Sequence, residues 1–208
     1  MSVKGDIEIV ASVPTLNVSR VIERSDIYGP GLRSVIWVQG CDLACKGCWN
    51  TDLWPKDGGE KIQVDQLHKR LLSVKGVEGV TILGGEPLQQ SPALLELLIL
   101  QSEAGRGIML YSGYEMDELD EIQKACVELA DIAILGRYIE EERDTTLRWR
   151  GSSNQKITSP TGMFDESSIE DGENEVSVHI DSKGEITVIG YPDMETMLEV
   201  IGGLVEEI

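Results

Sequence analysis

The sequence predicts an α/β fold in which short buried strands alternate with amphipathic helices. Three apolar runs, at residues 77–83, 108–111 and 132–135, have the length and composition of buried strands. Apolar residues at helical spacing precede and separate these runs. A chain that returns to one sheet through successive helices is expected to build a parallel sheet, because each crossover leaves the next strand pointing the same way.

The first expected elements lie ahead of these strands. Ile7, Ile9 and Ala11 alternate with polar residues, which fits an edge strand. The apolar run 35–38 follows a Gly-Pro-Gly break and is the first core strand. The stretch 51–59, with Trp54, Pro55 and a Gly pair, is rich in turn residues.

Three helices are expected between the later strands. The first carries Leu67, Leu71 and Val74 on one face. The second is expected to begin with Ser91 as its N-cap, followed by Pro92 at the first helical position. The third has an apolar stripe formed by Met116, Leu119, Ile122, Cys126 and Val127.

The pattern changes after residue 158, so we divide the chain into a core domain, 1–158, and a C-terminal part, 159–208. Residues 165–175 contain six acids and no bases, which predicts an exposed loop. Residues 176–188 alternate on both sides of a turn and predict a β-hairpin. Residues 194–204 predict a last amphipathic helix, and we expect this whole part to pack on the core.

Composition excludes some classes of function. The 208 residues, 41% hydrophobic and 26% charged, suit one globular domain. A net charge of −19 argues against binding to a nucleic-acid backbone, which needs basic surface. The sequence has no apolar run of membrane-spanning length and no signal-peptide pattern at its N-terminus, so we expect a cytoplasmic protein without a membrane partner.

Three cysteines follow the first core strand. Cys41, Cys45 and Cys48 have the spacing C-x3-C-x2-C, and thiolates so close together can hold one inorganic centre. A structural zinc site normally closes with four ligands, and no histidine lies nearby. A 4Fe–4S cubane held by three cysteines instead leaves one iron open for chemistry. A zinc knuckle, or reduced cysteines in the core, is the alternative.

A second motif follows the strand at 77–83. Gly84, Gly85 and Glu86 stand at its carboxyl end, where ligands bind in folds of this kind. The glycines let the backbone approach a ligand closely, and the carboxylate can accept a hydrogen bond from a cationic amine. The spacing from the cysteines makes this motif more informative than an isolated Gly-Gly-Glu.

Together these motifs resemble the radical S-adenosylmethionine superfamily. The segment GPGLRSVIWVQGC is similar to its glycyl-radical-enzyme activases, and LRWRGSSNQKI, at 147–157, resembles a segment of the anaerobic ribonucleotide-reductase activases. The resemblance implies a partial, open (β/α) barrel and an oxidoreductase with a 4Fe–4S cluster on Cys41, Cys45 and Cys48. One electron from the cluster would cleave S-adenosylmethionine to a 5′-deoxyadenosyl radical, which takes a hydrogen atom from a glycine of a large partner.

The resemblance also implies a set of cofactor-binding residues. Gly84, Gly85 and Glu86 would hold the methionine end of the cofactor. Trp49 would shield the cluster or pack near adenine, with core packing as the alternative, and Ser112 would bind polar cofactor groups unless it only shapes a turn. The full set is Gly47, Trp49, Asn50, Gly84, Gly85, Glu86, Ser112 and Asn154.

Three functions remain open from the sequence. The first is activation of a large glycyl-radical subunit, with an electron donor similar to flavodoxin or ferredoxin. The second keeps the radical chemistry but acts on a small molecule or peptide, as deazaguanine synthases and peptide maturases do. The third is a metal-binding module without catalytic activity. It would not cleave S-adenosylmethionine, so no deoxyadenosine would form on reduction.

Overall fold

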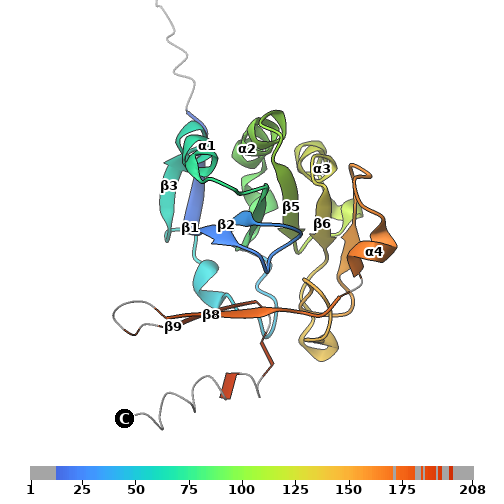
Figure 1. The fold of residues 1–208 in the computed structure, drawn as a ribbon. Helices are drawn as coiled ribbons and strands as arrows, with labels where there is room; N and C mark the ends of the chain where they lie inside the picture. Colours follow the sequence, from blue (N-terminus) through green and yellow to red (C-terminus); the bar gives the residue numbers. More distant parts are fainter. Residues whose placement is uncertain are drawn as a thin grey trace, which may run out of the picture.

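The computed structural model describes residues 13–170, 172–180, 184, 186–190, 192–193 and 197–198. Its main element is a seven-stranded sheet in the order β3-β1-β2-β4-β5-β6-β7 (Figure 1). The strands are β1 (Thr15–Ser25), β2 (Arg33–Val38), β3 (Glu60–Gln63), β4 (Gly79–Gly84), β5 (Gly107–Ser112), β6 (Ile132–Leu135) and β7 (Lys156–Thr158). The chain therefore has the mixed α/β fold that the alternating pattern predicts.

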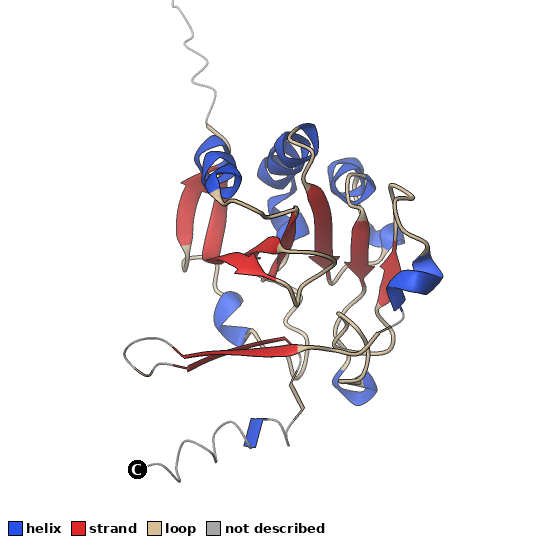
Figure 2. Cartoon of the chain, in the orientation of Figure 1, coloured by secondary structure: helices blue, strands red, loops and turns tan. Residues whose placement is uncertain are grey.

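In the described part of the chain, helices α1–α3 and short 3-10 turns connect these strands, and α4 follows the last of them (Figure 2). The helices are α1 (Val64–Ser73), α2 (Ser91–Glu103), α3 (Glu121–Glu128) and α4 (Glu166–Glu170). The turns are η1 (Thr51–Leu53), η2 (Pro87–Gln90), η3 (Met116–Glu118) and η4 (Glu140–Glu142). A separate hairpin of β8 (Val176–Ile180) and β9 (Ile186–Gly190) confirms the hairpin that the C-terminal alternation predicts.

The sheet is parallel only in its centre. β2, β4, β5 and β6 run parallel, as expected for strands joined through helices. β1 pairs with β2 and β3 in antiparallel fashion, and β7 pairs with β6 in the same way. β1 joins β2 through a short loop rather than a helical crossover, and such a connection can only reverse the chain.

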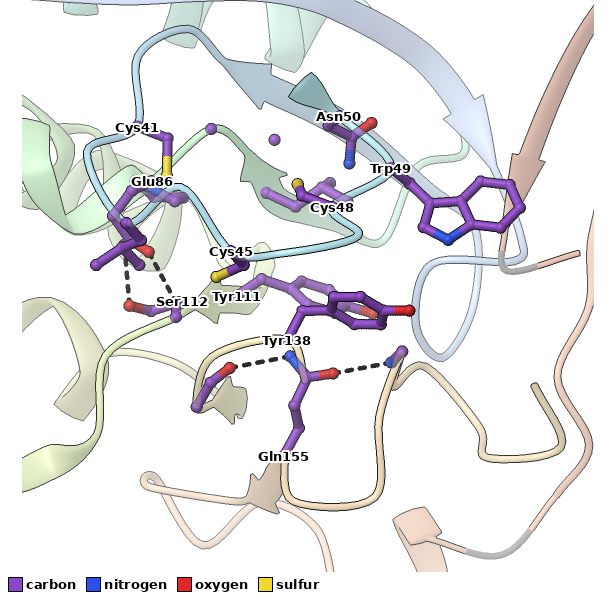
Figure 3. A pocket seen from close by; sticks show the side chains of 18 of the residues that line it. Cys41, Cys45, Cys48, Trp49, Asn50, Glu86, Tyr111, Ser112, Tyr138 and Gln155 are labelled. Carbon is purple, nitrogen blue, oxygen red and sulfur yellow. Dashed lines mark hydrogen bonds between the residues drawn. The ribbon is translucent and has the colours of Figure 1, made fainter. Parts of the chain in front are cut away.

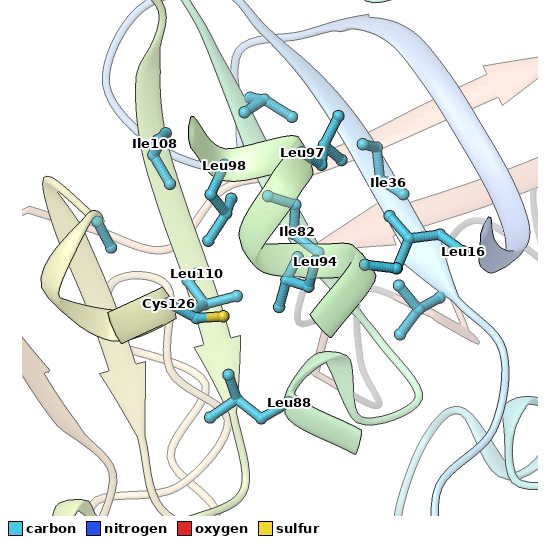
Figure 4. Close-up of a cluster of buried hydrophobic side chains, with 14 of the residues drawn as sticks. Leu16, Ile36, Ile82, Leu88, Leu94, Leu97, Leu98, Ile108, Leu110 and Cys126 are labelled. Atoms are coloured by element: carbon cyan, nitrogen blue, oxygen red, sulfur yellow. The ribbon is translucent and has the colours of Figure 1, made fainter. Parts of the chain in front are cut away.

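The two faces of the sheet contribute to different cores. On one face, Leu94, Leu97 and Leu98 of α2 pack against Ile82 and Leu110 of the strands (Figure 4). We call the face that α1–α3 leave uncovered the inner face. It buries a second cluster that includes Trp37, Tyr111, Trp149, Ile169 and Ile189. Because both faces are buried, the central strands are apolar throughout, which explains their continuous hydrophobic runs.

Two details of the helices differ from expectation. Ser91 is the first residue of α2 rather than its N-cap, because η2 leads directly into the helix and Gln90 takes the cap position. The third helix is divided into η3 and α3, because Asp120 forms a capping box with Gln123 and starts a new helix. Met116 and Ile122 are consequently 46% and 43% exposed, whereas Cys126 is fully buried.

Other expectations concern the ends of the chain. The acidic stretch 165–175 contains the short helix α4, so it is not an irregular loop throughout. The strand expected at 7–11 lies outside the described residues, as does most of the last helix expected at 194–204. Among the residues that the structure describes, no helix is both long and apolar enough to cross a membrane.

Arg33 ties the central strands together at their amino-terminal edge. Its side chain donates to Thr81 Oγ1 at 2.8 Å, to the Val80 carbonyl at 2.8 Å and to the Gly107 carbonyl at 2.9 Å. Only 4% of the residue is exposed, and burial lowers the pKa of its guanidinium to about 10. The group stays charged near neutral pH and links β2 to β4 and β5.

Replacing this arginine tests its role in stability. Arg33→Met keeps the apolar stem but leaves buried oxygen acceptors without donors, so we expect the free energy of unfolding to fall by about 3 kcal/mol. Arg24→Met is the control, because Arg24 is exposed and donates to the Lys75 carbonyl, and it should change that free energy by at most about 0.5 kcal/mol. Urea denaturation measures both, and equal losses would contradict the role of Arg33.

Candidate active site

The three cysteines lie on one loop, which we call the cluster loop (residues 41–48), directly after β2. The carboxyl ends of β4 and β5 meet this loop, and the pocket between them is lined by Cys41, Cys45 and Cys48 (Figure 3). All three thiols are partly buried rather than sealed in the core. The structure thus excludes the reading in which they are inert core residues.

Backbone groups surround two of the sulfur atoms. Amide N–H groups of Leu43 and Ala44 donate to the Cys41 sulfur, and that of Tyr138 donates to the Cys45 sulfur. Ala44 has a φ of 46°, a left-handed conformation that turns the loop back on itself. Partial burial raises the pKa of the Cys41 and Cys45 thiols, and these N–H donors oppose the shift. Such donors stabilise charge on a metal-bound thiolate.

The Gly-Gly motif holds the end of β4 against the cluster loop. The Gly85 amide donates to the Val38 carbonyl at 2.8 Å, and the Glu86 amide donates to the Gly40 carbonyl at 2.8 Å. A Cβ atom on Gly85 would stand 2.3 Å from the Gly40 oxygen, which no side chain can do. The glycines are therefore needed for contact between two stretches of backbone, a role that the sequence motif alone does not indicate.

Glu86 joins the ends of β4 and β5. Its carboxylate accepts from the Leu88 amide at 2.9 Å, from Ser112 Oγ at 2.9 Å and from the Gly113 amide at 2.8 Å. Only 1% of the residue is exposed, and burial raises its pKa to about 7 although these donors oppose the shift. The side chain lines the pocket and also braces its wall.

Six of the eight expected cofactor-binding residues line the pocket, and two do not. Gly47 faces η4, where a Cβ atom would meet the Glu140 carboxylate at 2.8 Å. Asn154 lies outside the pocket and donates to the Arg137 carbonyl at 2.8 Å. Trp49 lines the pocket but is 48% exposed, so core packing is excluded. The six are Trp49, Asn50, Gly84, Gly85, Glu86 and Ser112.

The outer lip of the pocket consists of Trp49, Tyr138 and Arg143, and sequence reasoning named Trp49 but missed Tyr138 and Arg143. The Arg143 guanidinium lies 4.6 Å from the centre of a Trp49 ring, and the Trp49 side chain hydrogen-bonds the Tyr138 hydroxyl. Gln155 holds the adjoining loop by accepting from the Gly151 amide at 2.8 Å and donating to the Gly136 carbonyl at 3.0 Å. The GSSNQ segment signals Gln155, but no motif signals Arg143.

The residues present fit an iron–sulfur cluster. Within the described part of the chain, no three His, Cys, Asp or Glu side chains are gathered closely enough to hold one ion. The three cysteine sulfurs instead stand around one end of a pocket (Figure 3). A cubane, whose irons are separate and each prefer a thiolate, suits such a spread set of sulfur ligands.

The fold and this site define an α/β iron–sulfur protein. The family described as 4Fe-4S single cluster domain matches residues 27–158, and the chain belongs to that family. It is 34% identical over 139 residues to the anaerobic ribonucleoside-triphosphate reductase-activating protein of Escherichia coli K12, a match that covers 63% of this chain and 90% of that protein. The protein of the same name from Haemophilus influenzae is 36% identical over 141 residues, with the same coverage.

One solved structure is similar at a greater distance. QueE from Escherichia coli aligns with a TM-score of 0.42 and 15% sequence identity, over 56% of this chain and 69% of that chain. A likeness at this level has no bearing on the function of the pocket.

The contact at Gly85 gives a test of the site. Gly85→Ala would push the Gly40 carbonyl away and displace the cluster loop, so we expect a loss of about 3 kcal/mol in unfolding free energy and poor iron incorporation. Gly107→Ala is the control, because its Cβ would approach no atom more closely than the Asp131 carboxylate, at 3.4 Å, which is ordinary van der Waals contact. Denaturation and iron analysis measure the effects, and normal iron loading of the Gly85 variant would refute the argument.

Glu86 gives a pH-dependent prediction. Its pKa is about 7 in the folded chain and near 4.5 ordinarily, so between these values the folded state keeps a proton that the unfolded state releases. The free energy of unfolding should therefore fall as pH rises through this window. Glu86→Gln has no carboxyl proton to release, so its free energy of unfolding should lack the part of this fall that comes from Glu86. Denaturation of the metal-free proteins from about pH 4 to about pH 8 checks it. A difference between the two proteins that is constant with pH would contradict it.

Proposed function

We propose that this protein reductively cleaves S-adenosylmethionine and installs a glycyl radical on a large subunit resembling an anaerobic ribonucleotide reductase. Membership of the single-cluster family and the names of the relatives support this function. The observation that carries it is that three cysteines of one loop line a pocket together with Gly84, Gly85 and Glu86.

In this proposal, each wall of the pocket has a task. Cys41, Cys45 and Cys48 hold a 4Fe–4S cluster. The backbone at Gly84 and Gly85, with the Glu86 carboxylate, binds the amino-acid end of S-adenosylmethionine. Trp49, Asn50 and Ser112 contact the rest of the cofactor, whereas Gly47 and Asn154 lie outside the pocket lining.

When bound, the cluster and S-adenosylmethionine supply one-electron cleavage of a sulfonium and the hydrogen abstraction that follows. The side chains and backbone of the protein position the cluster and S-adenosylmethionine, shield them from water and hold the pocket wall in place. Apolar side chains of Leu83, Trp54 and Tyr111 line the pocket and limit the access of water. No side-chain base is required, and the electron would come from a small carrier similar to flavodoxin or ferredoxin.

The architecture fits the same proposal. We infer that the sheet is one side of an open (β/α) barrel, that residues 1–158 form the catalytic domain, and that 159–208 pack on it. An open barrel leaves room for a large protein to complete the site. A reducing, cytoplasmic setting follows from the sensitivity of an open cluster to oxygen.

Anaerobic reconstitution tests the function. With iron, sulfide, S-adenosylmethionine, a reductant and a candidate glycyl-radical subunit, we expect a glycine-centred signal in electron paramagnetic resonance. Cys48→Ala should lose the cluster and the signal, because a thiolate ligand is missing. Cys126→Ala should keep both, because Cys126 is buried away from the pocket.

Two other outcomes would redirect the assignment. Release of 5′-deoxyadenosine without any signal from the subunit would indicate a small-molecule or peptide substrate. A protein that binds iron but releases no 5′-deoxyadenosine would be a binding module.

A further inference from the structure

The family match ends at residue 158, and the described chain continues beyond it with α4 and the hairpin of β8 and β9. The hairpin of β8 and β9 runs across the carboxyl ends of the central strands (Figure 1). Ile169 of α4 and Ile189 of β9 are 4% and 3% exposed, and both belong to the cluster on the inner face of the sheet. α4 and the hairpin thus cover part of the inner face of the sheet.

Two hydrogen bonds fasten the end of this hairpin. The Gly190 amide donates to the Tyr28 hydroxyl at 2.8 Å, and Arg143 donates to the Pro192 carbonyl at 2.7 Å. Arg143 also stacks on Trp49 and lines the pocket. The hairpin is therefore tied directly to the lip through which the pocket opens.

The hairpin is attached through one of its faces. Val178 pairs with Val188 and Ile180 with Ile186, and Val178 and Ile180 are 41% and 63% exposed. On the other face, Ile189 is buried against the core. A two-stranded hairpin has little stability alone, so it depends on a buried isoleucine and a few hydrogen bonds. Such an attachment can be broken by a competing partner.

We propose that this hairpin is a displaceable cover, and that the glycine-bearing segment of the protein substrate takes its place on the inner face. The inference rests on the proposed function. Transfer of a hydrogen atom requires the glycine Cα to come within about 3.5 Å of the reacting cofactor carbon, so a stretch of partner backbone must enter the pocket. The lip formed by Trp49, Tyr138 and Arg143 is tied to the hairpin, and entry beside it disturbs that tie.

Charge indicates the chemistry of the partner surface. Residues 159–208 contain thirteen acids and one lysine, a net charge of −12 out of −19 for the whole chain. Most of these acids flank the hairpin rather than lie in it, so a basic surface next to the glycine segment attracts the segments on either side of the cover and draws the cover away from the core with them. Binding of the partner should therefore weaken as salt is raised, and binding that is independent of salt would contradict a basic partner surface.

Hydrogen exchange on the full chain tests displacement without any radical chemistry. Purified glycyl-radical subunit is added to the reconstituted protein, and exchange is followed at the amides of 176–180 and 186–190. We expect these amides to exchange at least tenfold faster in the complex, while the central strands β4 and β5 stay protected. Unchanged or slower exchange would overturn the inference, because the hairpin would then be a fixed platform for docking.

A conservative variant gives a second readout. Tyr28→Phe removes the acceptor for the Gly190 amide and keeps the ring, which packs edge-on against Trp37 at 5.4 Å. Loosening the cover should speed exchange in the free hairpin and tighten binding of the partner about fivefold. Tyr114→Phe is the matched control, because its hydroxyl accepts from Gln89 away from the hairpin, and it should change neither quantity.

The outcomes separate this inference from the function on which it rests. A subunit that does not bind and acquires no glycyl radical would overturn the proposed function, and the inference with it. A subunit that binds and acquires the radical while Tyr28→Phe weakens its binding would overturn the inference alone.

Discussion

The site depends on one contact between two stretches of backbone, where Gly85 meets the Gly40 carbonyl. The end of β4 and the start of the cluster loop are held together by amide–carbonyl bonds, with no space for a side chain between them. Backbone contacts of this kind are rigid because they do not depend on rotamers. The cluster loop and the turn at Glu86 both start from this contact.

The amino-terminal and carboxyl edges of the central strands have different roles. At the amino-terminal edge, Arg33 uses its donors on neighbouring strands and stays away from the pocket. At the carboxyl edge, Glu86 binds three donors and still lines the pocket. Contacts that stabilise the sheet are present at both edges, but the pocket lies only at the carboxyl edge, where ligands usually bind in folds with parallel strands.

The sequence predicted those features that depend only on residues close together in the chain, such as single strands and short motifs. The run 132–135 matches β6, and the residues of the cysteine spacing and of the Gly-Gly-Glu turn line one pocket in the structure. The antiparallel edges were not predictable, because pairing of β1 with β2 and β3 is a matter of tertiary contact. Arg143 was missed for the same reason, since its role comes from Trp49 and Pro192, which are far from it in the chain.

The burial of Cys126 has a consequence for repair after exposure to air. Burial raises the pKa of this thiol to about 12 and leaves none of its surface accessible, so it neither competes for iron nor exchanges with oxidised partners. The reactive sulfur in the described part of the chain is thereby confined to the cluster loop. A protein that has lost its cluster can be reduced and reloaded there without a fourth thiol diverting the process.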